Sequence, residues 1–340
     1  MSVLAQRLTA QLVAGAPARD PVAVVERLLA VQAQDARGAR LAVRSRSAGL
    51  TAADVDRALT DARSLLVTWL NRGTLHLVRR EDYPWLQRLT TPRLHTSNAR
   101  RLSQEGVSPE AAERGVAVIE QSLADEGPLD RDRLRERVAA AGVRTQGQAF
   151  VHLLALASIR GLIVRGPMVA GKHAFVLVRD WLGEPEPVDR DRALAELARR
   201  YLAGHGPADA RDLAWWAGLP LRDARAGLDA IASDLVERDD GLVDLKRRSV
   251  TSSIPHARLL GPYEPVLLGW KSREFLLGDN EPRVVGGGVF CAFALVRGRA
   301  VATWTISRHN VDLEPFGRLT RADQSSLEAE AEEVKRFLSN

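Results

Sequence analysis

Two glutamines that flank one small apolar residue form the most distinctive polar group in this sequence. Gln32-Ala33-Gln34 follows the apolar run VVERLLAV. Residues two apart do not share a helix face, so both amides can act on one target only where the helix ends or distorts, and Gly38 supports such an end. An amide oxygen accepts a hydrogen bond from water and favours developing positive charge without titrating, so the pair can position a water for hydrolysis.

The same segment also has a structural interpretation, in which two solvated glutamines lie in the last turn of a helix. Asp35 adjoins the motif. Its side chain is expected to point away from that of Gln34, which favours a surface or helix-end role over that of a general base. The residues alone leave both interpretations of Gln32 and Gln34 open.

Signatures of other chemistries are missing from the sequence. It contains no phosphate loop and no HExxH, CxxC or GxSxG motif, and its seven histidines are dispersed without metal-ligand spacing. The glycines at 286–288 lie between strand-like runs, which predicts a turn or bulge rather than a dinucleotide loop. We therefore predict neither a metal nor a nucleotide cofactor.

The composition of the chain limits the cellular compartments and the kinds of site that we expect for the protein. The single cysteine, Cys291, excludes an internal disulfide and multi-cysteine zinc sites, and its context VFCAFAL predicts burial. No apolar stretch reaches the roughly 18 residues of a membrane span, and the first residues lack a signal-peptide core. These features predict a cytoplasmic protein that does not associate with a membrane.

Basic charge is concentrated at the start of the chain. Residues 1–110 hold 16 arginines against 10 acidic residues, whereas the rest of the chain has a net charge of −1. Arginine accounts for all but four of the 48 basic residues, and its planar guanidinium suits bidentate contacts with phosphate. The bias favours a nucleic-acid partner, although codon usage also enriches arginine.

A block of helices followed by two short strands recurs three times, in the order of a winged helix-turn-helix unit. We predict an α+β fold with three tandem winged helix-turn-helix units and a β-rich C-terminal region. The predicted boundaries are 1–105, 106–186, 187–250 and 251–340. The last region is expected to end in an amphipathic helix that begins near Thr320 or Asp323.

Local signals mark helix starts and hairpins within the first two blocks. Asp20 and Pro21 open a helix predicted over 21–31, and Asn71-Arg72-Gly73 joins two β-rich runs into a hairpin. The turn of the second wing is expected at 166–172.

The third block holds the clearest helix-turn-helix, with its turn at 218–220. We expect at least one of Trp215 and Trp216 to pack in the core between its helices.

Five motifs of the chain resemble, in order and spacing, the winged-helix proteins that include the AlkZ-like DNA glycosylases. They are LLAVQAQDARGARLAVRSR, WLNRGTLHLVRREDYPWL, ARDLAWWAGL, LLGPYEPVLLGW and GRAVATW, and they extend over nearly the whole chain. The resemblance implies three winged-helix units around a concave DNA-binding surface. It also implies a catalytic Gln-x-Gln or Gln-x-Asp motif, which Gln32 and Gln34 match.

The chain departs from that family at one stretch. The family often has an acidic residue before Tyr-Leu-Leu-Gly-Tyr and an Asp-Arg pair after it. Here the stretch reads YEPVLLGWKSRE, which keeps Glu264 and has Ser272 in place of the later acid.

The resemblance implies a monofunctional DNA glycosylase that hydrolyses the N-glycosidic bond of alkylated purines in damaged double-stranded DNA. Alkylation of a ring nitrogen makes the base a cationic leaving group, so placing the water is the main remaining task. Only four lysines occur and none lies in residues 1–110, which disfavours a Schiff-base nucleophile and AP lyase activity. The lesion stays open between a methyl adduct, a bulky natural-product adduct and an interstrand crosslink, and so does the choice between general repair and toxin self-resistance.

Further site residues follow from the same comparison. Thr74 and His76 alternate along a strand, share one face and match the family's RGTLH stretch, so they are expected to line the site, with a structural histidine as the alternative. Arginines around the motif are expected to contact phosphates, with a solvated basic face as the alternative for each. These arginines are Arg37, Arg40, Arg44, Arg46 and Arg72.

A non-catalytic DNA-binding protein, such as a transcription regulator, is the alternative function. A regulator has no need of two amides at a helix end, but the C-terminal helix could serve its dimerisation. We infer no obligate protein partner. Because no base-reading motif is identifiable, DNA binding is expected to be independent of sequence and to weaken with salt.

Overall fold

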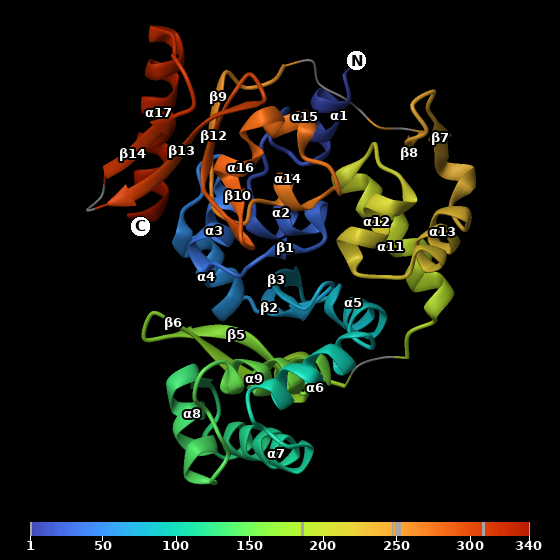
Figure 1. The fold of residues 1–340 in the computed structure, drawn as a ribbon, viewed down its shortest axis with the longest axis vertical. Coiled ribbons are helices and arrows are strands. Elements are labelled where there is room, and N and C mark those ends of the chain that lie inside the picture. Colours follow the sequence, from blue (N-terminus) through green and yellow to red (C-terminus); the bar gives the residue numbers. More distant parts are fainter. Residues whose placement is uncertain (1, 185–186, 247, 249–252, 308–309, 340) are drawn as a thin grey trace. The chain divides into compact units, whose positions relative to one another are not determined.

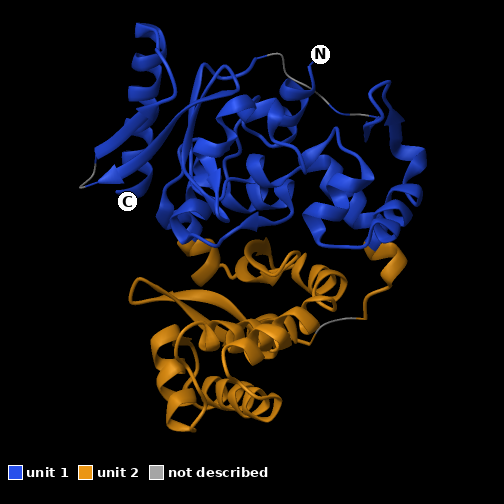
Figure 2. Cartoon of the chain, viewed as in Figure 1, with its two compact units in different colours: residues 1–55, 194–340 blue, residues 56–193 orange. Residues whose placement is uncertain are grey.

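The computed structural model describes all residues except 1, 185–186, 247, 249–252, 308–309 and 340. Its helices and strands fall into two compact units (Figure 1, Figure 2). Unit 1 comprises residues 1–55 and 194–340, and unit 2 comprises residues 56–193. In the described parts of both units, no helix is long and apolar enough to cross a membrane.

Unit 1 begins with α1 (Val3–Ala10), α2 (Pro21–Leu28), the short strand β1 (Val31–Gln32) and α3 (Ala36–Arg44). The start of α2 agrees with the prediction, because an Asp20 carboxylate oxygen accepts a hydrogen bond from the Val22 amide at 3.0 Å and Pro21 lies in the first turn. The end of α2 differs from the prediction, because Leu29 takes a φ of 64° and residues 31–32 are extended. The helix predicted over 21–31 is therefore wrong in its last turn.

Three helices and a hairpin follow in the order α11 (Arg190–His205), α12 (Ala210–Ala217), α13 (Leu221–Asp229), β7 (Leu235–Glu237) and β8 (Val243–Leu245). Gly218, with a φ of 69°, ends α12 at the predicted turn. Trp216 is 4% exposed, and its ring lies 5.3 Å from that of Tyr201 and 5.2 Å from that of His205. Core packing is thus confirmed for one of the two adjacent tryptophans.

A four-stranded antiparallel sheet dominates the C-terminal part of unit 1. Its order is β14 (Asn310–Pro315), β13 (Arg299–Ser307), β12 (Phe293–Val296) and β9 (Ala257–Leu260). The helix α17 (Arg321–Leu338) packs on this sheet around Leu259, Trp304 and Leu327 (Figure 1). The predicted start of α17 is confirmed by a capping box in which Thr320 and Asp323 bond each other's backbone amides.

Short elements connect β9 to β12. They are α14 (Pro265–Leu268), α15 (Glu274–Leu277), α16 (Glu281–Val284), β10 (Val285–Gly286) and β11 (Val289–Phe290). The turn predicted at 286–288 is confirmed as the hairpin turn between β10 and β11, where Gly287 and Gly288 have positive φ. The predicted burial of Cys291 is wrong, because this residue lies in the exposed loop after β11 and the chain enters the core only at Phe293.

Unit 2 contains the rest of α4 (Ala52–Thr60), an antiparallel sheet and six further helices. The strands are β2 (Leu65–Leu70), β3 (Thr74–Arg79), β4 (Leu129–Asp130), β5 (Ile163–Val169) and β6 (Lys172–Leu177). The helices are α5 (Tyr83–Thr90), α6 (Leu94–Gln104), α7 (Pro109–Glu126), α8 (Arg131–Ala140), α9 (Ala149–Ile159) and α10 (Val178–Leu182). Within the unit the strand order is β3-β2-β5-β6-β4.

The first two predicted hairpins join into this one sheet. β2 and β5 pair through Val67 and Arg165, and β2 is buried at every position, which is the pattern of an interior strand. The turn of the second hairpin, predicted at 166–172, is shorter than expected. β5 continues to Val169, and only residues 170–171 form the turn.

The start of α3 is held by a close backbone approach within unit 1. A Cβ atom on Gly38 would lie 2.5 Å from the carbonyl oxygen of Pro262, so the helix can come this near only with glycine there. Asp35 is the N-cap of α3, and its carboxylate accepts a hydrogen bond from the Gly38 amide at 2.5 Å. The helix-end role predicted for Asp35 is confirmed, and Asp35 follows Gln34 directly.

Replacing Gly38 with alanine is therefore expected to destabilise unit 1 by about 1–3 kcal/mol, because the new Cβ atom must displace backbone. Urea unfolding followed by tryptophan fluorescence measures the effect. Gly317→Ala is the matched control, since no atom lies within 4 Å of its Cβ position. Equal midpoints for the two variants would contradict the close approach of α3 to Pro262.

Candidate active site

The glutamine pair lies in the segment that connects α2 to α3. Gln32 is the second residue of β1, and Gln34 follows between β1 and the N-cap of α3. The segment is therefore not the distorted helix end that we had expected. Gln32 ends a two-residue strand, and Gln34 lies in the bend that follows it.

The two amides differ in burial. Gln32 is 7% exposed, whereas Gln34 is exposed. The side-chain oxygen Oε1 of Gln32 is buried and has no hydrogen-bond donor among the residues that the structure describes. A buried amide oxygen without a donor is unusual, because leaving it unpaired costs about 1–3 kcal/mol. Such an oxygen is ready to accept a hydrogen bond from a water or a ligand.

Arg46 was predicted to contact DNA phosphate, and the structure shows this to be wrong. Its side chain is completely buried and forms an ion pair of 2.5 Å with the equally buried Glu264. A further bond of 3.0 Å reaches the Oε1 atom of Gln11, and others reach the Ala42 carbonyl and the Ser45 hydroxyl. Arg46 therefore joins the C-terminal end of α3 to the end of α1 and the start of α14, and it has no exposed surface that could contact DNA.

The predicted phosphate contact of Arg44 is also wrong, because this side chain is buried and paired inside the protein as well. It is 7% exposed, donates to the Leu259 carbonyl at 2.5 Å and pairs with Glu330 at 3.0 Å. Burial lowers the pKa of Arg44, while the charge of Glu330 acts against that shift. Glu330 also binds Arg258 and the Leu259 amide, so it ties α17 and β9 to α3.

The remaining predicted arginines keep some exposure. Arg37 is exposed on α3, and Arg40 is half-buried with a hydrogen bond to the Ala36 carbonyl. Arg72 is half-buried in the hairpin turn of unit 2, together with the predicted site residues Thr74 and His76. The predicted residues thus divide between the two units.

The hairpin of β2 and β3 positions His76. Asn71 and Gly73 take positive φ values of 52° and 81° in its turn, and the register pairs Thr68 with His76. The Nδ1 atom of His76 lies 2.9 Å from the Thr74 carbonyl oxygen. Because a carbonyl only accepts, Nδ1 carries the proton and Nε2 presents a lone pair.

His76 is a neutral imidazole in the folded protein. It is 3% exposed, and burial lowers its pKa to about 3, helped by the charge of Arg72 and opposed by the bond to Thr74. Such a group accepts a hydrogen bond at Nε2 near neutral pH but holds no proton there to give away as an acid.

The hairpin also carries the polar groups Thr68 and Asn71, which were not predicted to line the site, beside the predicted Thr74. Thr68 and Asn71 are 0% and 1% exposed, and Thr68 Oγ1, Thr74 Oγ1 and both side-chain amide atoms of Asn71 have no hydrogen-bond partner within the described ranges. Thr68 is the cross-strand neighbour of His76, so their side chains share a face. The hairpin register about the Asn71-Arg72-Gly73 turn, which places Thr68 opposite His76, was the signal in the sequence that could have identified Thr68.

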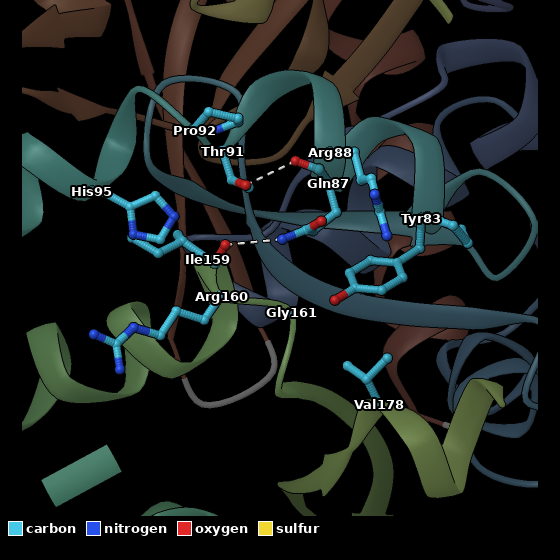
Figure 3. Close-up of a pocket in the computed structure, with 11 residues that line it drawn as sticks. Tyr83, Gln87, Arg88, Thr91, Pro92, His95, Ile159, Arg160, Gly161 and Val178 are labelled. Atoms are coloured by element: carbon cyan, nitrogen blue, oxygen red, sulfur yellow. Dashed lines mark hydrogen bonds between the residues drawn. The ribbon is translucent and has the colours of Figure 1, made fainter. Parts of the chain in front are cut away.

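A cavity of about 510 Å³ lies elsewhere in unit 2, lined by α5, the start of α6 and the end of α9 (Figure 3). Gln87 donates from its amide nitrogen to the Ile159 carbonyl at 2.9 Å on its wall, and burial raises the pKa of Tyr83. None of the predicted site residues lines it. In the described residues, no group of three or more His, Cys, Asp or Glu side chains is placed to hold a metal ion.

Residues 25–337 match the family model described as DNA glycosylase AlkZ-like. The chain belongs to the AlkZ-like DNA glycosylase family.

Two comparisons identify similar proteins from Streptomyces sahachiroi. A protein described as an interstrand DNA cross-link repair glycosylase is 28% identical over 344 residues, which cover 92% of this chain and 89% of that protein. The solved structure of the DNA glycosylase AlkZ is similar with a TM-score of 0.78 and 25% identity, covering 98% of this chain and 95% of the other. The mixed α and β structure of this chain thus matches that of the AlkZ glycosylase.

Removing the buried charge of Arg46 is expected to lower the free energy of unfolding strongly. Arg46→Met leaves Glu264 buried without a cation, which costs about 3–5 kcal/mol of unfolding free energy. The exposed Arg37→Met is the control, with a change within about 0.5 kcal/mol. Urea unfolding curves of the two variants test the correction, and similar midpoints would show that Arg46 is not an internal ion-pair partner.

The low pKa of His76 gives stability a pH dependence. The unfolded histidine titrates near 6.5 and the folded one near 3, so the unfolded state binds the extra proton between these values. The contribution of His76 to the free energy of unfolding is therefore fully present above about pH 6.5. It falls at lower pH, by at most ~1.4 kcal/mol per pH unit.

His205, whose pKa burial also lowers to about 3, adds a second contribution of the same sign. His76→Gln should remove the contribution of His76, giving a shallower loss of unfolding free energy from pH 6.5 to 4.5 in urea titrations. An unchanged slope would mean that the His76 imidazole is protonated in the folded protein.

Proposed function

We propose that this chain is a monofunctional DNA glycosylase that hydrolyses the N-glycosidic bond of alkylated purines, with Gln32 and Gln34 as its catalytic residues. The observation that carries the proposal is the buried Oε1 atom of Gln32, which has no donor among the described residues and belongs to the last residue of β1, two residues before Gln34. The family of the chain supports it.

The chemistry asks little of the protein beyond placing a water. In an alkylated purine the ring is already cationic, so the base takes the electrons of the bond to C1′ and leaves as a neutral molecule. A water held by the Gln32 oxygen attacks C1′ and releases its proton to solvent. The amide dipoles favour the positive charge that develops on the deoxyribose before the water bonds.

We further propose that the helix and hairpin blocks are winged helix-turn-helix units with the boundaries 1–105, 106–186 and 187–250, followed by the region 251–340. The order α11, α12, α13, β7 and β8 supports the third unit, because a hairpin follows a helix-turn-helix there. Arg37, Arg40 and Arg72 keep the exposure that phosphate contacts need. We propose damaged double-stranded DNA as the partner and the cytoplasm as the place of action.

The similar protein from Streptomyces sahachiroi is described as a cross-link repair glycosylase, and its name guides the choice of lesion. We include bulky adducts and interstrand crosslinks among the substrates of this chain. AP lyase activity is not part of the proposal, because the four lysines of the chain all lie outside the glutamine segment.

Replacing Gln32 or Gln34 with alanine should cut single-turnover excision of an alkylpurine from duplex DNA by roughly 10² or more, with little change in DNA affinity. The double variant should be scarcely slower than the worse single variant, because both amides serve one water and one sugar. Excision is measured by cleavage of the abasic product, and affinity by fluorescence anisotropy.

Gln146→Ala is the control for these variants, since Gln146 is exposed in unit 2 and outside the motif. Full excision by the double variant would remove the catalytic role of the pair. Tight binding without excision by the wild type on every alkylated duplex tried would favour a non-catalytic DNA-binding protein instead.

A further inference from the structure

Arg165 on β5 carries a charge that its surroundings do not balance. Its guanidinium carbon lies 5.2 Å from the ring centroid of Trp69 and 5.0 Å from that of Phe175. Both rings are buried, at 6% and 1% exposure. The Nε atom of Arg165 is buried without a hydrogen-bond partner, and in the described part of the chain no carboxylate pairs with this guanidinium.

The lack of a carboxylate partner has an energetic cost because Arg165 stays charged. Burial, and next the nearby charge of Arg131, lower the pKa of Arg165 to about 10. The guanidinium is therefore still protonated at neutral pH. Attraction to two ring faces offsets only part of the cost of removing a cation from water. Arg44 and Arg46 in unit 1 each have a glutamate, so the lack of one beside Arg165 is a local feature.

The backbone holds Arg165 in a defined place. It pairs with Val67 on one side and with Phe175 on the other, and the register of β5 and β6 shifts directly after it, between Arg165 and Met168. The bulge includes Gly166, where a Cβ atom would lie 2.7 Å from the Trp181 ring. Bulges of this kind direct a side chain away from the regular sheet pattern and recur beside functional sites.

We propose that Arg165 binds a backbone phosphate of the nucleic acid, with the rings of Trp69 and Phe175 holding the guanidinium in position and Arg131 adding to the positive potential. The identity of the anion as a nucleic-acid phosphate rests on the proposed function. A guanidinium fixed between two rings loses little freedom on binding, and its planar donors match the geometry of phosphate oxygens.

The test compares Arg165→Met with the wild type on a short undamaged duplex. Affinity should fall about tenfold, and the slope of log affinity against log salt should become shallower by about one, as expected for the loss of one phosphate contact. The melting temperature should not fall, because methionine fills the space between the rings without a charge to desolvate. Arg165→Lys, which keeps the charge and loses the planar fork, should lie between the two.

Arg179→Met is the charge-matched control. It removes an arginine of the same unit that pairs with Glu120 at 2.7 Å, and it should leave affinity and salt slope nearly unchanged. Unchanged DNA binding together with a lower melting temperature for Arg165→Met would overturn the proposal and show a purely structural stack.

Excision of an alkylpurine, measured on the same samples, separates this proposal from the proposed function. If the wild type excises nothing but its DNA binding depends on Arg165, the proposed glycosylase activity would be overturned and the proposed phosphate contact would be supported. Excision by the wild type with unaltered binding by Arg165→Met would overturn only the phosphate site. A wild type that does not bind duplex would overturn both.

Discussion

The buried ion pair between Arg46 and Glu264 is the interaction on which the arrangement of unit 1 depends. Neither side chain has any exposed surface, so both ions have lost their hydration and must regain that energy inside the protein. The geometry meets this demand, because Arg46 also binds Gln11, Ser45 and the Ala42 carbonyl. One charge thereby sets the relative positions of α1, α3 and the segment before α14.

The glutamine site follows from that constraint. With its C-terminal end held by Arg46, α3 can bring its first turn against Pro262, where only glycine fits at position 38. Asp35 then caps the helix, and the two extended residues of β1 precede this cap, with Gln34 in the bend between them. Preorganised amides stabilise a transition state without first reorganising themselves, so a rigid support is what this chemistry requires. A buried acceptor such as the Gln32 oxygen can be maintained only in such a framework.

Much of the fold could be predicted because its signals are local. The cap at Asp20, the capping box of Thr320 and Asp323, and the glycine turn at 286–288 each depend on a few neighbouring residues. Arg44 and Arg46 were misplaced on a DNA surface for the opposite reason. Their partners Glu330 and Glu264 lie 286 and 218 residues away along the chain. The local sequence therefore shows that the two residues are charged but does not show that they are buried. The positive φ of Leu29, which ends α2 early, has no local signal either.

The central claim is that the Gln32 oxygen holds the attacking water. A crystal structure with a duplex that carries a 2′-fluoro analogue of an N7-alkylguanine nucleotide, whose glycosidic bond resists cleavage, tests this directly. The account predicts an ordered water about 2.6–3.2 Å from Gln32 Oε1 on the face of C1′ opposite the base. A lesion bound with its C1′ remote from Gln32, or with that oxygen bonded only to protein groups, would contradict it.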